Sequence, residues 1–439
     1  MKGIRLIVIL LFMIPCFYGK TAEKVPLESA IAAGLKKDYN YLNTVLDQER
    51  AELQRRLSEK NKLFRLSFDG SYIYRSETMV IDFPSTQVPG GGLIPGREIE
   101  AGVNHIFDLK LSLTQPLFTG GILSNSIKVE EVQAAVQANQ KTLKENEISG
   151  LIKSSYFQYL LLIRRQRSLS TLERTLHLHR QRIANLLDEG LARKTDLLET
   201  LSKIEEIQLN ITDIEQAVEA ERIQFHRLCG YYPEEIDDSY LEKPATHEEA
   251  LSYFEETHPV LRSLQNRIEM LSLQKNIAAG KYLPQVSGFA EVHYGRPGVD
   301  YFAKEWTLYF QGGIMVTVPI FDWNRLSSEK TLIDIQKQKL ENQKHQFVKD
   351  LAASLEQLFS SIRKLEEKHE RLTRLIAYSE EDAALKKGLY EERQIPNVDY
   401  LAALLTREKN LLAKDEIRIQ IEMIKVNINT LIGRSKEGS

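Results

Sequence analysis

Side chains that could carry catalysis are few in this 439-residue chain, and they are far apart. His177 and His179 are two residues apart in a segment with helical periodicity, so they point to different faces of the helix. Asp237 and Asp238 lie in an acidic linker, and no Ser/His/Asp or metal-ligand cluster is visible in the sequence. We therefore expect no catalytic residues, no metal site and no cofactor, and the protein is predicted not to be an enzyme.

The cysteines and the charge exclude further classes of protein. Apart from Cys16, the chain contains only Cys229, whose apolar Leu-Cys-Gly surroundings are typical of a packed, inert thiol. A single thiol also excludes an internal disulfide framework and a Cys-based zinc site. The net charge is −3, so the acidic and basic residues nearly cancel and nothing indicates a nucleic-acid partner.

The N-terminus predicts a secretory signal peptide over residues 1–22. Residues 1–5 are a charged n-region, and the apolar run from Leu6 to Cys16 is too short to span a bilayer. The cleavage site stays open, because neither Gly19 nor Ala22 has a good small residue two positions before it. Cys16 offers a lipidation alternative, although Pro15 directly before it is a poor match to that processing signal. No later apolar run is long enough for a transmembrane helix, so the mature chain is secreted, periplasmic or embedded in a membrane as strands.

Two segments of the chain carry the same landmarks in the same order and at the same spacing. The equivalent pairs are Pro116 and Pro319, Asp196 and Asp399, and Gly230 and Gly433, and the interval is identical in all three. Three landmarks that stay in step over about 115 residues predict two copies of one structural unit.

Long amphipathic helices occupy much of each copy. From Leu123 to Asp188 there is no proline, and apolar residues recur at spacings of three, four or seven, which is typical of a coiled-coil-like helix. Leu326 to Glu392 repeats the pattern. Short breaks at residues 189–194 and 393–397 precede second helices of about 35 residues, so two antiparallel helical hairpins are expected. By themselves these helices would favour a structural coiled-coil scaffold.

The segments before the helices alternate as strands do. Phe107 to Thr114 alternates apolar and polar residues without error, which places Leu109, Leu111 and Leu113 on one face and Lys110 and Ser112 on the other. Phe310 to Thr317 keeps the same phase in the second copy. Two further alternating runs come earlier, one with Phe68, Gly70, Tyr72 and Tyr74 and the other with Val286, Gly288, Ala290, Val292 and Tyr294. The chain therefore predicts two hairpins with four strands.

An apolar face opposite a small polar face is typical of a membrane β-barrel. Four strands cannot close a barrel, so several protomers must share one sheet, and three protomers would supply twelve strands. The alternative is a small soluble sheet that caps a helical rod. Residues 76–104, with the run Pro89 to Gly96, predict a flexible external loop; no helix start or lysine follows, so a phosphate cradle is excluded.

In this order and spacing, the motifs of the chain resemble those of the TolC family of outer-membrane efflux and secretion channels. The resemblance covers essentially the whole chain. It is carried by Leu283-Pro284-Gln285-Val286 entering a strand, by Gln115 to Gly121 and Val318 to Asp322 leaving one, by the helix-tip segments Gly190-Leu191, Thr195 to Leu198 and Val398 to Leu401, and by the closing Leu228-Cys229-Gly230 and Leu431-Ile432-Gly433.

The resemblance implies an α+β membrane protein with two tandem repeats, each a β-hairpin and a long antiparallel helical hairpin. A homotrimer would form a twelve-stranded barrel in the outer membrane, continuous with a twelve-helix tunnel in the periplasm. Pro116 and Pro319 would end strands where the chain turns into helix, because proline removes a ladder donor. The expected regions after the signal peptide are an N-terminal periplasmic helix (23–62), β-hairpin 1 (63–118), helical hairpin 1 (119–230), an equatorial linker (231–257), a helix of repeat 2 (258–283), β-hairpin 2 (284–321), helical hairpin 2 (322–433) and a C-terminal tail (434–439).

In the family, hydrogen bonds and salt bridges near the helix tips nearly close the far end of the tunnel. Matching the motifs residue by residue places Tyr390, Asp399, Thr195 and Asp196 at that aperture. Ile395 stands where some members have a latching arginine, and Ala402 stands where some have a second acidic ring, so the latch is expected to differ and only one carboxylate ring is expected. Thr195 and Asp196 could equally be a helix N-cap with an acid in the first turn.

The function implied by the resemblance is a passive exit duct. Its partners would be a periplasmic adaptor, which docks at Gly190, Leu191, Ala192, Gln394 and Ile395, an inner-membrane transporter of the RND or ABC type, and outer-membrane lipid. The cargo is not encoded in the motifs. The alternative function is a structural coiled-coil envelope protein without channel activity.

Overall fold

The computed structural model describes residues 24–236, 241 and 246–434. The predicted signal peptide with Cys16, and the pair Asp237 and Asp238, lie outside the described residues. The chain forms two compact units: a helical unit from the described residues of 1–39, 145–250 and 355–439, and a sheet unit from 40–144 and 251–354. Helices α3 (Ile122–Asp188) and α7 (Arg325–Glu391) contribute to both units.

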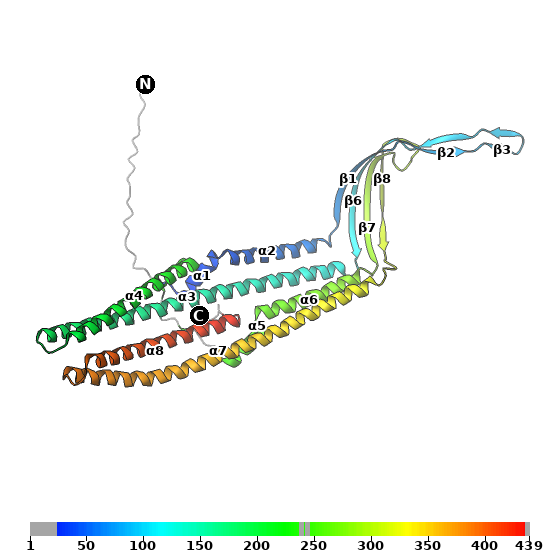
Figure 1. The fold of residues 1–439 in the computed structure, drawn as a ribbon. Coiled ribbons are helices and arrows are strands. Elements are labelled where there is room, and N and C mark those ends of the chain that lie inside the picture. The colour runs from blue at the N-terminus through cyan, green and yellow to red at the C-terminus, as the bar shows by residue number, and fades with distance from the viewer. Residues whose placement is uncertain (1–23, 237–240, 242–245, 435–439) are drawn as a thin grey trace, which may run out of the picture. The chain divides into compact units, whose positions relative to one another are not determined.

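The sheet unit contains a four-stranded antiparallel sheet in the order β1-β6-β7-β8 (Figure 1). The strands are β1 (Arg65–Tyr74), β6 (His105–Phe118), β7 (Gln285–Arg296) and β8 (Thr307–Thr317). Leu111 lies opposite Phe68 and Val292, and Val292 lies opposite Phe310. The alternating runs predicted from the sequence therefore share one face of the sheet. The pairing of β6 with β7 also joins the two expected hairpins.

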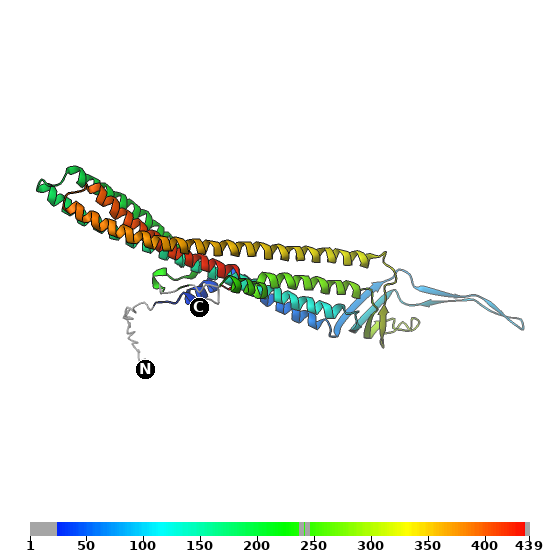
Figure 2. The same ribbon diagram turned by 90° about the horizontal axis from the view of Figure 1, so that it is seen from below.

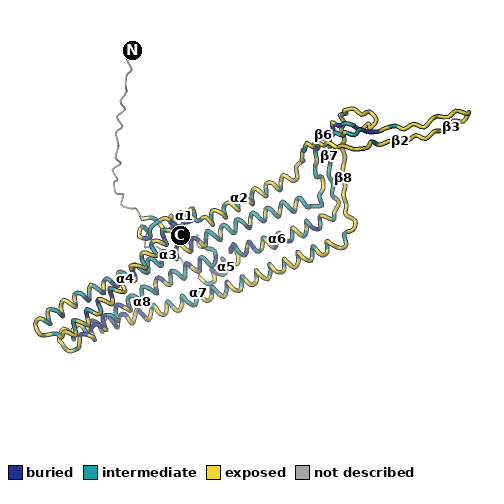
Figure 3. Tube along the Cα trace, turned by 45° about the horizontal axis from the view of Figure 1, so that its top comes forward, coloured by how far each residue is buried: buried dark blue, intermediate teal, exposed yellow. Residues whose placement is uncertain are grey.

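The segment between β1 and β6 is a paired ribbon, so the expectation of a flexible loop was wrong. Strand β2 (Met79–Phe83) pairs with β5 (Arg97–Ala101), and β3 (Thr86–Val88) pairs with β4 (Gly92–Ile94). Gly90 and Gly91 have positive φ angles and close the turn between β3 and β4. The glycines thus serve a tight turn, and most of the ribbon is exposed (Figure 3).

Pro116 and Pro319 lie in different places relative to their strands. Strand β8 stops at Thr317, shortly before Pro319. Strand β6 runs past Pro116 to Phe118, so the expectation that Pro116 ends the strand was wrong. The register with β7 shifts between Pro116 and Phe118, and an irregularity of this kind accommodates a residue without a backbone donor.

Element bounds repeat along the chain at two different intervals. The starts of α3 and α7 are as far apart in sequence as Pro116 and Pro319, and so are their ends. The starts of α4 (Lys194–Cys229) and α8 (Asn397–Leu431) are separated by the same number of residues. For the elements before the ribbon, the interval between equivalent starts is longer. The equivalent pairs are α1 (Leu27–Lys37) and α5 (His247–Thr257), α2 (Tyr39–Lys60) and α6 (Pro259–Gly280), and β1 and β7. The difference arises between β1 and the end of β6, where the ribbon is inserted.

In the helical unit, α3, α4, α7 and α8 run side by side, and both hairpin tips lie at the same end (Figures 1 and 2). Apolar residues from α3, α4 and α8 share one core, which explains why the predicted periodicity is so regular. A 3₁₀ turn (Pro233–Glu235) follows α4. The buried residues of this core are Leu169, Leu172, Leu176, Ile204, Ile207, Ile214, Leu401 and Leu404.

The cleft at the tips of the helical hairpins

Both tips turn by the same backbone geometry. The N–H of Leu191 donates to the carbonyl of Leu186 at 2.7 Å, and the N–H of Gln394 donates to the carbonyl of Leu389 at 2.8 Å. The residue before each donor, Gly190 or Arg393, has a left-handed φ of 69° or 64°. This is the Schellman motif, which satisfies carbonyls left free at a helix C-terminus.

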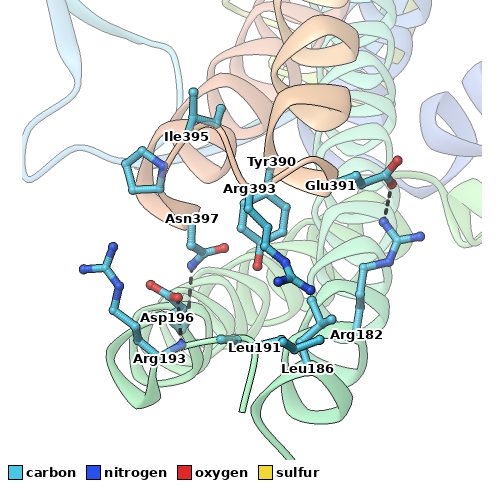
Figure 4. A pocket seen from close by; sticks show the side chains of 12 residues that line it. Arg182, Leu186, Leu191, Arg193, Asp196, Tyr390, Glu391, Arg393, Ile395 and Asn397 are labelled. Carbon is cyan, nitrogen blue, oxygen red and sulfur yellow. Dashed lines mark hydrogen bonds and ion pairs between the residues drawn. The ribbon is translucent and has the colours of Figure 1, made fainter. Parts of the chain in front are cut away.

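A cleft of about 410 Å³ lies between the two tips (Figure 4). Several residues predicted from the sequence line it, whereas Thr195, Asp399, Gly190 and Gln394 do not. Arginines and carboxylates together give the cleft a mixed charge. Its lining residues are Arg182, Leu186, Leu191, Ala192, Arg193, Asp196, Tyr390, Glu391, Arg393, Ile395, Pro396 and Asn397.

A buried hydrogen-bond network ties the two tips together. His179 of α3 is 6% exposed, and its Nε2 lies 2.6 Å from Oδ1 of Asn397, the first residue of α8. The Asn397 amide donates to the carbonyl of Asp196 at 3.1 Å and to Oγ1 of Thr200 at 3.3 Å. Asn397 therefore joins three helices. The side chain of His177 is 41% exposed, so the two histidines do face different ways as predicted.

Aromatic rings enclose the imidazole of His179. The ring centroids of Tyr390 and Tyr400 lie 5.3 and 5.0 Å from that of His179, and the two tyrosines stack at 5.7 Å. Burial raises the pKa of Tyr390, and the nearby charge of Asp196 raises the pKa further. These ring contacts hold Tyr390 in place. Its hydroxyl makes no hydrogen bond with the described residues.

An ion pair spans the tips at the mouth of the cleft. The guanidinium of Arg182 on α3 contacts the carboxylate of Glu391 on α7 (Figure 4). Both side chains are about half exposed, so the pair stabilises the contact by at most about 1 kcal/mol. The buried His179 network is consequently the more specific tie.

Thr195 is not the N-cap of α4, contrary to that alternative. The helix begins at Lys194 with Arg193 as its N-cap, and the N–H of Arg193 donates to the carboxylate of Asp196 at 3.2 Å. Asp196 is thus an acid in the first turn, where its charge interacts favourably with the positive end of the helix dipole. Asp399 holds the equivalent place in α8 and is exposed outside the cleft.

A second concavity lies between the N-terminal turns of α4 and α8. Its volume is about 650 Å³, and Leu198, Val398, Leu401, Ala402 and Leu405 give it an apolar floor. Ser202 and the charged side chains of Glu199, Lys203 and Glu206 line its rim on α4. Leu198 and Val398 are each more than half exposed, so this groove has an unpartnered apolar surface within one chain.

His179, Asn397 and Arg182 were not singled out as tip residues from the sequence. The periodicity around His179 shows only that it lies in a helix, and its partner Asn397 is 218 residues away in the chain. Only the packing of α3 against α8 brings them together. No group of three or more His, Cys, Asp or Glu side chains in the described parts of the chain is arranged to hold a metal ion.

The described helices include none with an apolar run long enough to cross a membrane. The sequence matches no model of a known protein family and no curated protein. Solved structures do share the architecture. CusC, described in a study of transmembrane channel formation, aligns at a TM-score of 0.73 and 13% identity over 93% of each chain. The outer-membrane protein VceC of Vibrio cholerae aligns at 0.73 and 14% identity over 93% of this chain and 96% of that one.

The open-state outer-membrane channel MtrE of Neisseria gonorrhoeae aligns at a TM-score of 0.70 and 15% identity, covering 93% of this chain and 88% of that one. The chain has the fold of the outer-membrane channels. The resemblance to the TolC family is therefore confirmed in fold. At identities of 13% to 15% the likeness establishes the fold alone.

Proposed function

We propose that three copies of the chain form a channel in the outer membrane: a twelve-stranded barrel continuous with a twelve-helix periplasmic tunnel. The channel is a passive exit duct without catalytic groups. A periplasmic adaptor couples it to an inner-membrane transporter of the RND or ABC type.

The single observation that carries this proposal is the two-faced sheet. One face presents exposed apolar side chains from all four strands, among them Phe68, Leu111, Val292 and Phe310. The opposite face carries charged and polar side chains at its centre, where Glu291 contacts Ser112 at 3.3 Å and Lys110 at 3.5 Å. A sheet with lipid on its outer face and water on its inner face requires this division.

Aromatic residues mark both ends of the apolar face. At one end, Phe107 contacts Tyr72 and Trp306 at centroid distances of 4.9 and 5.5 Å, and Trp306 stacks on Tyr294 at 5.1 Å. At the other end lie Phe64, Phe118, Phe321 and Trp323. Two belts of aromatic residues, separated by strands of 10 to 14 residues, match the two interfaces of a bilayer.

The outer strands of the sheet support assembly. Strands β1 and β8 are the two ends of the sheet order, and each has one edge without a strand partner among the described residues. Free edges on exposed strands favour pairing with another chain. In a ring of three protomers, β8 of one copy pairs with β1 of the next, which closes the barrel.

The groove between α4 and α8 supports the adaptor contact. On α4 its apolar floor begins at Leu198, close to the tip residues Gly190, Leu191 and Ala192 that the family resemblance marks for docking. An apolar floor with a charged rim suits a partner helix that buries a narrow apolar stripe. Gln394 and Ile395 form the corresponding tip of the second hairpin.

Fractionation of cells that produce the protein tests the proposal. The protein should be found in the outer-membrane fraction and should run as an oligomer that dissociates to the monomer on heating. A soluble monomer would instead favour the structural coiled-coil function.

A further inference from the structure

The hydrogen bonds of Asn397 fix the tautomer of His179. The Asn397 amide nitrogen faces the carbonyl of Asp196, which can only accept a hydrogen bond, so Oδ1 of Asn397 must face His179. Oδ1 is an acceptor, and Nε2 of His179 must therefore carry a proton and donate. In neutral His179 the other ring nitrogen, Nδ1, then carries none.

We propose that His179 and Asn397 form a proton-sensitive clasp, which holds the tips of the two helical hairpins together while His179 is neutral and releases them when the imidazole gains a second proton. The clasp itself does not depend on the proposed function. Only its consequence rests on that function: in a channel, a released tip widens the periplasmic entrance of the tunnel. His179 thus acts as a positioning residue, since it holds α8 through Asn397.

The surroundings of His179 disfavour a second proton. That proton would bind Nδ1 and place a full charge on a ring that is 6% exposed. No carboxylate contacts the ring among the described residues, and the nearest guanidinium, that of Arg182, is itself positive. Groups that surround His179 are Arg182 from its own helix, Asp196 and Thr200 from α4, Tyr390 and Glu391 from α7, and Asn397 and Tyr400 from α8.

The carboxylates among these groups are already engaged. Asp196 accepts a hydrogen bond from the backbone N–H of Arg193, and Glu391 pairs with Arg182. Among the described residues, no hydrogen bond or ion pair joins either carboxylate to the imidazole. A protonated His179 gains a counter-charge only if a tip moves, and gains solvation only if water reaches the ring.

The pKa of His179 agrees with this geometry. Burial lowers it below the ordinary value of 6.5 and Arg182 lowers it further, while the hydrogen bond with Asn397 opposes the shift. A group with a lowered folded-state pKa binds fewer protons in the closed tip than in the open one. The clasp therefore has its full stability above pH 6.5, and it loses stability as the pH falls below that value.

The test measures tip separation in the purified full-length protein. Spin labels are placed on cysteines introduced at Leu191 and Gln394, two exposed tip residues, while the native Cys229 is buried. Distance distributions are compared at about pH 7.5 and about pH 5. We expect the population with separated tips to rise by about fivefold or more at the acidic pH.

Two substitutions separate the clasp from general effects of acid. His179→Gln keeps an amide that can donate to Asn397 but cannot gain a proton, so it should abolish the pH response. His177→Gln is the matched control, because His177 lies two residues away on the same helix with a side chain that is 41% exposed, and it should respond as the unaltered protein does. A pH response that persists in His179→Gln, or is missing from the unaltered protein, would overturn the proposal.

Asn397→Asp provides a second variant in case His179→Gln fails to fold. A carboxylate at this position would accept from Nε2 and neutralise the imidazolium, so acid should separate the tips less than in the unaltered protein. An equal or larger acid response would count against the clasp. The spin-label distances can be measured whether or not the protein conducts ions, so the clasp and the channel are tested separately. A His179-dependent response in a protein that forms no pores would support the clasp and contradict the channel. Pores in a protein that lacks this response would support the channel and contradict the clasp.

Discussion

Gly190 and Arg393, which hold equivalent places in the two repeats, adopt the same left-handed backbone conformation at the two helix tips. The conformation is free of strain for glycine, whereas an arginine side chain crowds its own backbone there. The two residues thus form a natural pair for comparing a relaxed turn with a strained one.

Replacing Arg393 with glycine should raise the free energy of unfolding by about 0.5 to 1 kcal/mol, because it relieves the strain at a small entropic cost. Gly190→Ala should lower the free energy of unfolding by about 1 to 2 kcal/mol for the converse reason. Thermal unfolding in detergent measures both changes. A loss of stability in Arg393→Gly, or a gain in Gly190→Ala, would contradict the equivalence of the two turns.

Leu111 tests the lipid-facing side of the sheet. Leu111→Arg should cost about 2 to 4 kcal/mol near the bilayer midplane and should impair assembly. The sequence suggested Ser112→Arg as the tolerated control, but Ser112 is 7% exposed and bonded to Glu291. Ser71 lies on the same polar face and is exposed, so Ser71→Arg is the better control.

The yield of heat-dissociable oligomer after membrane extraction measures this effect. Leu111→Arg should reduce the oligomer strongly, while Ser71→Arg should leave it near the unaltered level. If both variants assemble equally well, the apolar face does not meet lipid.

Local patterns in the sequence were sufficient for the strands and long helices. The predicted helix from Leu123 begins one position after the start of α3 and ends with it at Asp188, because its periodicity runs without proline up to the tip. The ribbon was missed because its strands are short and its glycines and prolines dominate the composition. The His179 clasp could not be predicted, since His179 and Asn397 are 218 residues apart and no local pattern links them.

Asp399 tests the acidic ring. In the proposed trimer, three copies of this exposed carboxylate gather near the axis, which should attract cations and repel anions. Asp399→Ala should lower the cation selectivity of the pore and weaken its block by divalent cations. Reversal potentials in asymmetric salt measure the selectivity, and Asp415→Ala on the same helix is the control. Unchanged selectivity in Asp399→Ala would place the acidic ring elsewhere in the tunnel.

The groove between α4 and α8 tests docking. Leu198→Glu, or a bulky residue at Leu191, should abolish export without changing oligomer level or membrane insertion, because both side chains are exposed. Leu209→Glu is the matched control, because Leu209 is exposed on α4 but does not line the groove. Normal export by the Leu198 variant would show that the adaptor contacts another surface.

Single-channel recording in planar lipid bilayers tests the channel most directly. Protein extracted from outer membranes and purified as the heat-dissociable oligomer should insert and produce discrete conductance steps, while the heated monomer should produce none. An intact oligomer that binds the bilayer but never conducts ions would contradict the account.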